Sequence, residues 1–195
     1  MEKEKKKSKG KWIIIAIVVI AIIVIAASGS DDDEVKEVKS NTTQAAKSED
    51  KAKEDKETEK TEFNVGDTAE YKDIQISLTK VTESKGDGEF VKPEDGKVWL
   101  ICSFEIKNNS SDDITMSSIG CFEAYCDDVS INDDYMGMQA PEAKGQNTLD
   151  GDVASGKKMK GAIAYEVPKD WKKLEVNVKP SFWSSKDIKF IVKNK

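Results

Sequence analysis

Apolar and polar residues alternate with a period of two along much of the chain after residue 62. Such alternation is typical of β-strands that bury one face, because successive side chains of a strand point to opposite sides. It is clearest in segment 97–108, where every second residue from Val98 to Ile106 is apolar. Similar apolar runs occupy 73–81, 121–128, 161–168, 173–180 and 187–194. Stretches rich in Gly, Pro, Asn, Asp and Ser separate them, as expected for turns.

These segments predict an all-β domain over residues 63–195. Strands with one apolar face must bury those faces against each other, and two antiparallel sheets packed as a sandwich do this. We expect seven to nine strands. We expect no helix of ten or more residues in this domain, and at most a short turn within residues 132–145.

The pattern before residue 30 is different, because residues 12–27 form an unbroken run of sixteen apolar side chains. With the small residues that follow, 12–29 is long enough for a helix across a bilayer core about 30 Å thick. Six lysines and two glutamates precede the run, and four acidic residues follow it closely, at 31–34. Basic flanks stay on the cytoplasmic side. We therefore predict a basic cytoplasmic tip at 1–11, a transmembrane anchor at 12–29, and an extracytoplasmic remainder.

A cleaved signal peptide is the alternative interpretation of this run. Residues 26–29 read Ala-Ala-Ser-Gly, and small side chains of this kind suit a signal peptidase. The apolar regions of cleaved signals span about 7 to 15 residues, so the length favours retention. The chain would be secreted if cleavage occurs, and both alternatives export the domain.

Segment 30–62 is predicted to be a disordered, charged linker. Residues 31–62 hold twelve acidic and seven basic side chains, and the few apolar ones are valines and alanines. A segment of this composition buries too little apolar area to offset the entropy lost on ordering.

Four blocks carry a resemblance to a known family: FNVGDTAEYKDIQISLTKV (63–81), GKVWLICSFEIKNNSSDDI (96–114), CFEAYCDDVSI (121–131) and LDGDVASGKKMKGAIAYEVPKDWKKLEV (149–176). They resemble, in order, the DUF4352 family of exported immunoglobulin-like domains of Gram-positive bacteria. The last block is the most specific. The resemblance implies an immunoglobulin-like antiparallel β-sandwich facing the cell surface, and it brings no established activity. Lipoprotein members carry a cysteine where this chain continues its apolar run, which favours a transmembrane anchor here.

Composition restricts the chemistry, because the chain contains no histidine. This removes Ser-His and Cys-His catalytic pairs and the usual proton shuttle at neutral pH. We expect no enzyme activity and no cofactor. One catalytic alternative stays open: a cell-envelope hydrolase that uses a pair of carboxylates.

A calcium-dependent surface domain is a further alternative. Hard cations take oxygen ligands from loop carboxylates. Asp127, Asp128, Asp133 and Asp134 fall in predicted loops and are weak candidate ligands, although the spacing of a calcium-binding loop is missing. Loop aspartates also cap turns, so the prediction for metal is none.

Three cysteines in an exported domain raise the question of a disulfide. Cys102 lies on the apolar face of its predicted strand, and Cys126 shares the inward parity of its own strand. A Cys102–Cys126 bridge is a weak candidate, and Cys121, with the opposite parity, would stay unpaired. Buried reduced thiols would give the same sequence pattern.

Partners are restricted by charge and by the aromatic residues. The formal net charge of −6 argues against nucleic acid as a partner. Trp99, Trp171 and Trp183 could stack against a ligand, although packing in the sandwich is the commoner role of tryptophan. The sequence thus predicts a membrane-anchored, non-catalytic binding module of the cell envelope, whose partner is an unknown protein or cell-wall ligand.

Overall fold

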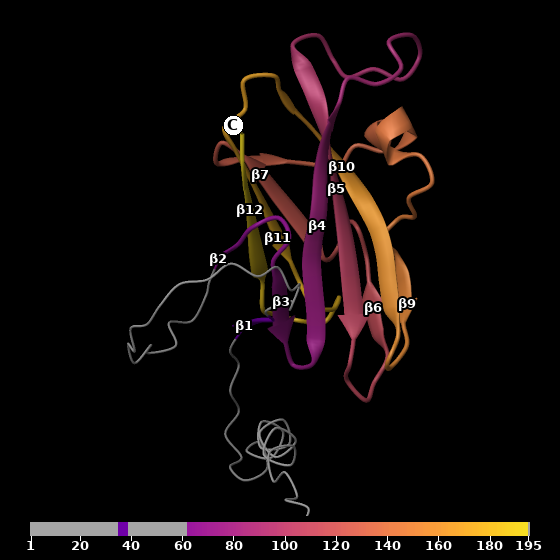
Figure 1. Cartoon of the computed structure of the whole chain (residues 1–195), viewed down its shortest axis with the longest axis vertical. Helices are drawn as coiled ribbons and strands as arrows, with labels where there is room; N and C mark the ends of the chain where they lie inside the picture. The colour runs from indigo at the N-terminus through magenta and orange to yellow at the C-terminus, as the bar shows by residue number, and fades with distance from the viewer. Residues whose placement is uncertain (1–34, 39–61, 195) are drawn as a thin grey trace, which may run out of the picture. The chain divides into compact units, whose positions relative to one another are not determined.

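The computed structural model of the chain describes residues 35–38 and 62–194, which form two five-stranded sheets and a two-stranded ladder (Figure 1). The first sheet has the order β1-β3-β4-β5-β10, and the second has the order β2-β12-β11-β7-β8. Strands β6 and β9 form the ladder. The predicted all-β fold is confirmed.

The strands of the first sheet are antiparallel throughout; they are β1 (Lys36–Glu37), β3 (Thr68–Tyr71), β4 (Ile74–Ser84), β5 (Lys97–Asn108) and β10 (Lys158–Pro168). Those of the second are β2 (Glu62–Phe63), β12 (Ile188–Lys193), β11 (Lys173–Val178), β7 (Phe122–Cys126) and β8 (Val129–Ile131), with β2 parallel to β12. The ladder joins β6 (Ile114–Met116) to β9 (Gly151–Val153). Two 3-10 turns, η2 (Gly137–Gln139) and η3 (Pro141–Ala143), lie between β8 and β9.

The count of seven to nine strands is too low, since ten strands form the two main sheets within the described residues. The additional strands include β1 and β2, which are two residues long and show no alternation. Strand β4 is interrupted by a bulge between Leu78 and Lys80, where its register against β5 shifts. An extra residue in one strand leaves the apolar side chains on both sides of the bulge facing the core.

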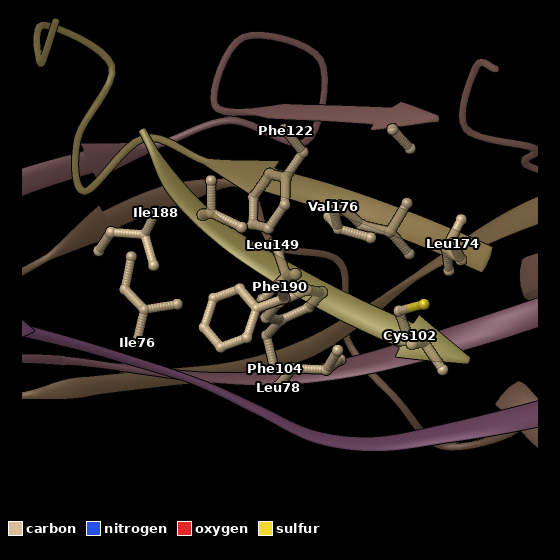
Figure 2. Close-up of a cluster of buried hydrophobic side chains, with 14 of the residues drawn as sticks. Ile76, Leu78, Cys102, Phe104, Phe122, Leu149, Leu174, Val176, Ile188 and Phe190 are labelled. Carbon is tan, nitrogen blue, oxygen red and sulfur yellow. The ribbon is translucent and has the colours of Figure 1, made fainter. Parts of the chain in front are cut away.

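The core lies between the two sheets, and aromatic rings occupy its centre (Figure 2). Phe104 of β5 meets Phe190 of β12 edge to face, with ring centroids 5.8 Å apart, and meets Phe122 of β7 at 5.3 Å. Phe63, the first residue of the predicted domain, packs on Phe190. The apolar face predicted for segment 97–108 therefore faces this core, as expected.

The opposite face of β5 is also buried, which one-sided alternation did not predict. Trp99 and Ile101 are 1% and 0% exposed, and they form a second apolar cluster with four alanines of β10 and of the η2–η3 segment. The uninterrupted run VWLIC, at 98–102, is typical of a strand that is covered on both sides. The short turn expected within 132–145 is thus two 3-10 turns that cover this face.

The predicted segments before residue 63 are mostly outside the described residues. The predicted anchor at 12–29 and the predicted tip at 1–11 lie entirely outside the described residues. Within the predicted linker, Val35–Val38 is described, and it is not disordered: Lys36 and Glu37 pair with Glu70 and Ala69. The buried side chain of Val35 joins the core, which accounts for the difference. No helix in the described part of the chain has the length and apolar character needed to cross a membrane.

Candidate functional site

The three tryptophans of the domain have different environments. Trp99 and Trp171 are 1% and 5% exposed, so both pack inside the domain as expected. Trp183 is 84% exposed and lies in the loop between β11 and β12. An indole left in water on a folded surface marks a place where a partner could bury it.

Trp183 is held in place by contacts on both sides of it in the sequence. Its ring meets that of Phe182 edge to face, with centroids 5.1 Å apart and planes at 85°. The backbone N–H of Phe182 donates to the carbonyl oxygen of Thr115 at 2.9 Å. The Phe182 ring also lies over Gly120, where an added Cβ would come within 2.5 Å of it. Ser184 N–H closes a turn onto the Ser181 carbonyl at 3.0 Å. These contacts hold the backbone on both sides of Trp183, whose exposed ring forms a platform on this surface.

A groove of about 330 Å³ runs beside this platform. Its apolar lining includes Ile74 at the start of β4 and Ile114 at the start of β6. Its lining also includes Tyr71 and Lys72, at the β3–β4 hairpin. The turn residues Lys72 and Asp73 have φ values of 47° and 64°, the left-handed conformation of a two-residue hairpin turn. The Nζ of Lys72 lies 5.3 Å from the centroid of the Tyr71 ring.

The polar residues that line the groove include four serines, Ser110, Ser181, Ser184 and Ser185. Among the described residues that line the groove, Lys72 is the one charged residue and none carries a carboxylate. This is unusual in a chain with 37 acidic residues out of 195. A concave surface with apolar walls and a few polar groups is the usual form of a small-molecule site.

Two other hollows are built differently. One, of about 310 Å³, lies against β4, β5 and β10, and its polar groups bind one another: Lys160 pairs with Glu105 at 2.5 Å, and Ser103 donates to Gln146 at 2.7 Å. The other, of about 240 Å³, lies by β7 and β8 and includes Tyr165, which is 2% exposed. Neither has an exposed tryptophan among its lining residues, so the groove beside Trp183 is the candidate site.

The predicted calcium ligands Asp127 and Asp128 occupy the two-residue turn between β7 and β8. Their φ values of 48° and 68° fit this turn. The Asp127 carboxylate accepts the backbone N–H groups of Lys173, at 2.8 Å, and Lys172, at 3.1 Å. Asp128 pairs with the Nζ of Lys173 at 2.6 Å. These carboxylates fasten a hairpin to the neighbouring strand β11.

Asp133 and Asp134 belong to a different structure, next to β10. Asp134 accepts the indole N–H of Trp99 at 2.9 Å and the backbone N–H of Met136 at 2.8 Å. The backbone of Asp133 forms an isolated bridge with Tyr165. Across residues 35–38 and 62–194, no three His, Cys, Asp or Glu side chains gather as a metal ion would require.

The cysteines are all buried free thiols. Cys102 and Cys126 face the core, as their parity predicted. Cys121 is buried as well, 1% exposed, because it precedes β7 and does not follow the parity of that strand. Its Sγ accepts the backbone N–H of Ser117 at 3.3 Å. The Cys102–Cys126 bridge is not formed in this structure and stays a prediction.

A carboxylate pair in a hydrolase includes one carboxyl with a raised pKa. The carboxyl groups whose pKa is clearly shifted here, those of Asp87 and Glu105, have a lowered pKa. Backbone N–H groups, that of Glu89 first, lower the pKa of Asp87. The ammonium group of Lys160, hydrogen-bonded to Glu105, lowers the pKa of that carboxyl. A general acid needs a raised pKa instead. The hydrolase alternative gains no support from these groups.

Sequence reasoning named Trp183 among three tryptophans but missed the rest of the site. Tyr71, Lys72 and the four serines come from segments far apart in the chain, and only the fold brings them together. The stretch PSFWSSK, at 180–186, holds the signal that was available: two adjacent aromatic residues within a polar loop.

The fold and the groove together define a two-sheet β-sandwich with a surface hollow whose lining includes four serines. The chain belongs to the family described as Domain of unknown function (DUF4352), whose sequence model matches residues 63–188. This match confirms the family resemblance. A search of curated proteins finds no match.

Several solved structures are similar. One is a Bacillus subtilis protein described as a putative lipoprotein (ycdA), with 18% identity and a TM-score of 0.50, covering 63% of this chain and 37% of that one. The yjhA protein of Bacillus subtilis has 23% identity and a TM-score of 0.49, covering 68% and 98%. An uncharacterized β-sandwich protein of Clostridium difficile has 15% identity and a TM-score of 0.44, covering 75% and 100%. This chain thus spans little more than a third of the first protein, and that likeness concerns the fold alone.

Proposed function

We propose that this chain is a non-catalytic binding module of the bacterial cell envelope, and that its ligand binds in the groove beside Trp183. The observation that carries the proposal is the 84% exposure of an indole that meets the Phe182 ring edge to face beside a hollow. An aromatic side chain has only two rotatable bonds and loses little conformational entropy when a partner covers it, so it is an efficient binding group.

The envelope location is part of the same proposal. It is supported by the sequence, in which a basic tip, an apolar run and an acidic segment follow one another. We propose a single membrane span at 12–29, with the N-terminus in the cytoplasm and the domain outside. We also propose that the sandwich is immunoglobulin-like, as the family resemblance implies. The partner is an envelope protein or wall component and not a nucleic acid, in keeping with the net charge of −6.

Retention of the full chain on cell envelopes tests the proposal. The chain is kept in detergent and mixed with detergent-washed envelopes of a Gram-positive bacterium, so that its apolar run cannot cause retention by itself. We expect Trp183→Ala to lower the cosedimented fraction several-fold, because truncating a central aromatic group commonly costs about 2 kcal/mol of binding free energy or more.

Phe90→Ala is the matched control. Phe90 is 86% exposed but lies outside the groove, so its removal takes away a comparable exposed aromatic ring at another place. This variant should cosediment like the unaltered chain. Equal retention of the Trp183→Ala variant and the unaltered chain would refute the proposed site.

A further inference from the structure

The walls of the groove suit a ligand with a flat apolar face. Two aromatic residues, Trp183 and Tyr71, are among its lining residues. The faces of aromatic rings carry negative potential, which attracts the weakly positive hydrogens of C–H groups. A sugar ring in the chair form can offer such a face, because several of its C–H bonds point the same way.

The rim of the groove suits the other part of a sugar, its hydroxyl groups. Within the residues that the structure describes, the side chains of Ser181 and Ser185 make no hydrogen bond, so each offers a donor and an acceptor. Ser184 Oγ accepts the backbone N–H of Lys186 at 3.1 Å, which fixes its position. Hydroxyl groups on both partners can exchange donor and acceptor roles, so such a rim matches a polyhydroxyl ligand.

The charge and the volume of the groove restrict the class of ligand that it can bind. No carboxylate is among the described residues that line the groove, so they do not favour a cation as ligand. Its volume of about 330 Å³ lies at the lower end of the range for small-molecule sites, about 300 to 1,000 Å³.

We propose that the groove binds a glycan, with one sugar ring stacked on Trp183 and its hydroxyl groups bonded to the serines of the rim. This inference rests on the proposed binding function and names the chemical class of its ligand. The two other occupants to be tested are an extended proline-rich peptide, which also docks on Tyr and Trp, and a lipid surface.

Titration of the full chain with soluble oligosaccharides tests the inference. The chain is held in a detergent whose head group contains no sugar, because a glycoside detergent would compete. The probes are the β-1,4-linked tetramers of N-acetylglucosamine and of glucose, and the α-1,4-linked glucose tetramer. We expect at least one tetramer to bind, seen by calorimetry and by a blue shift of tryptophan emission as Trp183 leaves water.

Variants assign the binding to the groove. Trp183→Ala should lower the affinity for the tetramer by about tenfold or more and abolish the shift in tryptophan emission. Trp183→Phe keeps a flat ring and should retain part of the affinity. Phe90→Ala should bind like the unaltered chain. The side chain of Trp183 is largely outside the core, so the midpoint of thermal unfolding should stay the same in each variant and thereby exclude misfolding.

The outcomes separate this inference from the proposed function. If no tetramer binds while envelope retention still depends on Trp183, the glycan inference fails and the binding function stands. Binding of a proline-rich decapeptide, or of phosphatidylglycerol vesicles to the same groove, with no sugar bound, would likewise overturn the glycan assignment. If Trp183→Ala changes neither retention nor sugar binding, both the proposed site and the inference fail.

Discussion

The cysteine at the centre of the core shows how burial controls chemistry at the scale of one residue. Cys102 is 0% exposed between the two sheets, and burial raises the pKa of its thiol to about 12. The thiolate is the reactive form, so this cysteine is both inaccessible and protonated at neutral pH. Burial also raises the pKa of Cys121 and Cys126.

We therefore predict that the thiols of the folded full chain resist modification. With a soluble disulfide reagent at pH 8, Cys102 should stay unlabelled for as long as the domain is folded, and three thiols should react in denaturant. Mass spectrometry of the labelled chain gives the count. Rapid labelling of Cys102 in the folded chain would contradict its burial, and a count of one in denaturant would reveal the Cys102–Cys126 bridge instead.

The exposure of a tryptophan at the candidate site cannot be predicted from its local sequence. The sequence shows that Trp183 lies in a polar loop, but it also shows a polar turn, Pro-Lys-Asp at 168–170, directly before Trp171, which is buried. Exposure depends on whether another segment covers the indole, and that is decided by contacts such as Phe182 on Gly120. The loop aspartates are a parallel case, because hairpin turns and caps use the same side chains as calcium sites.

At the scale of elements, the η2–η3 segment converts one face of the first sheet into a second small core. Gly137 of η2 approaches β5 and β10 so closely that an added Cβ would lie 2.6 Å from the Cβ of Ala164 and 2.9 Å from the Trp99 ring. Asp134 holds the start of the segment through the Trp99 indole N–H. The segment is therefore fixed by shape and by polar contacts, which also include the hydrogen bond from the Ser84 hydroxyl to the Glu142 carboxylate of η3.

Gly137→Ala should destabilise the domain, because the added methyl forces the segment away from the sheet. Overpacking of this kind costs about 1–3 kcal/mol, measured as the free energy of unfolding in urea. Met136→Ala, at the neighbouring and 47% exposed position, is the control and should change stability by less than about 1 kcal/mol. Equal stability of the two variants would show that the close packing at Gly137 has no energetic consequence.

The elements that the sequence predicted well are those with long alternation. Strands β4, β5, β10, β11 and β12 all fall within or around predicted segments, because their apolar side chains repeat at every second position. Strands β1 and β2 were missed since two residues cannot show a period. The cover over Trp99 was missed for another reason: its alanines, such as Ala140 and Ala143, are buried through their small size and carry no periodic signal.

At the scale of the whole molecule, the described domain is a self-contained sandwich, and its place in the cell depends on the predicted span at 12–29. Its main core lies between the two sheets, and a second small cluster covers the outer face of β5. Orientation is then determined by the flanks, with six lysines before the apolar run and four acidic residues closely following it. Moving lysine-rich flanks across a bilayer is disfavoured, so the domain should lie outside.

Protease treatment of intact cells that express the full chain tests this orientation. A retained anchor predicts a membrane-bound chain of 21.6 kDa, from which external protease removes the domain and leaves a short membrane-bound fragment. Replacing the lysines of the tip by glutamine is the control, because it removes the charge asymmetry and should reduce the fraction of domain that the protease reaches. A domain that appears in the medium in a shortened form would show that the apolar run is a cleaved signal, and full protection in intact cells would show that the orientation is reversed. Either result would change where a ligand can reach the groove, since an envelope glycan meets Trp183 only on the outer side of the membrane.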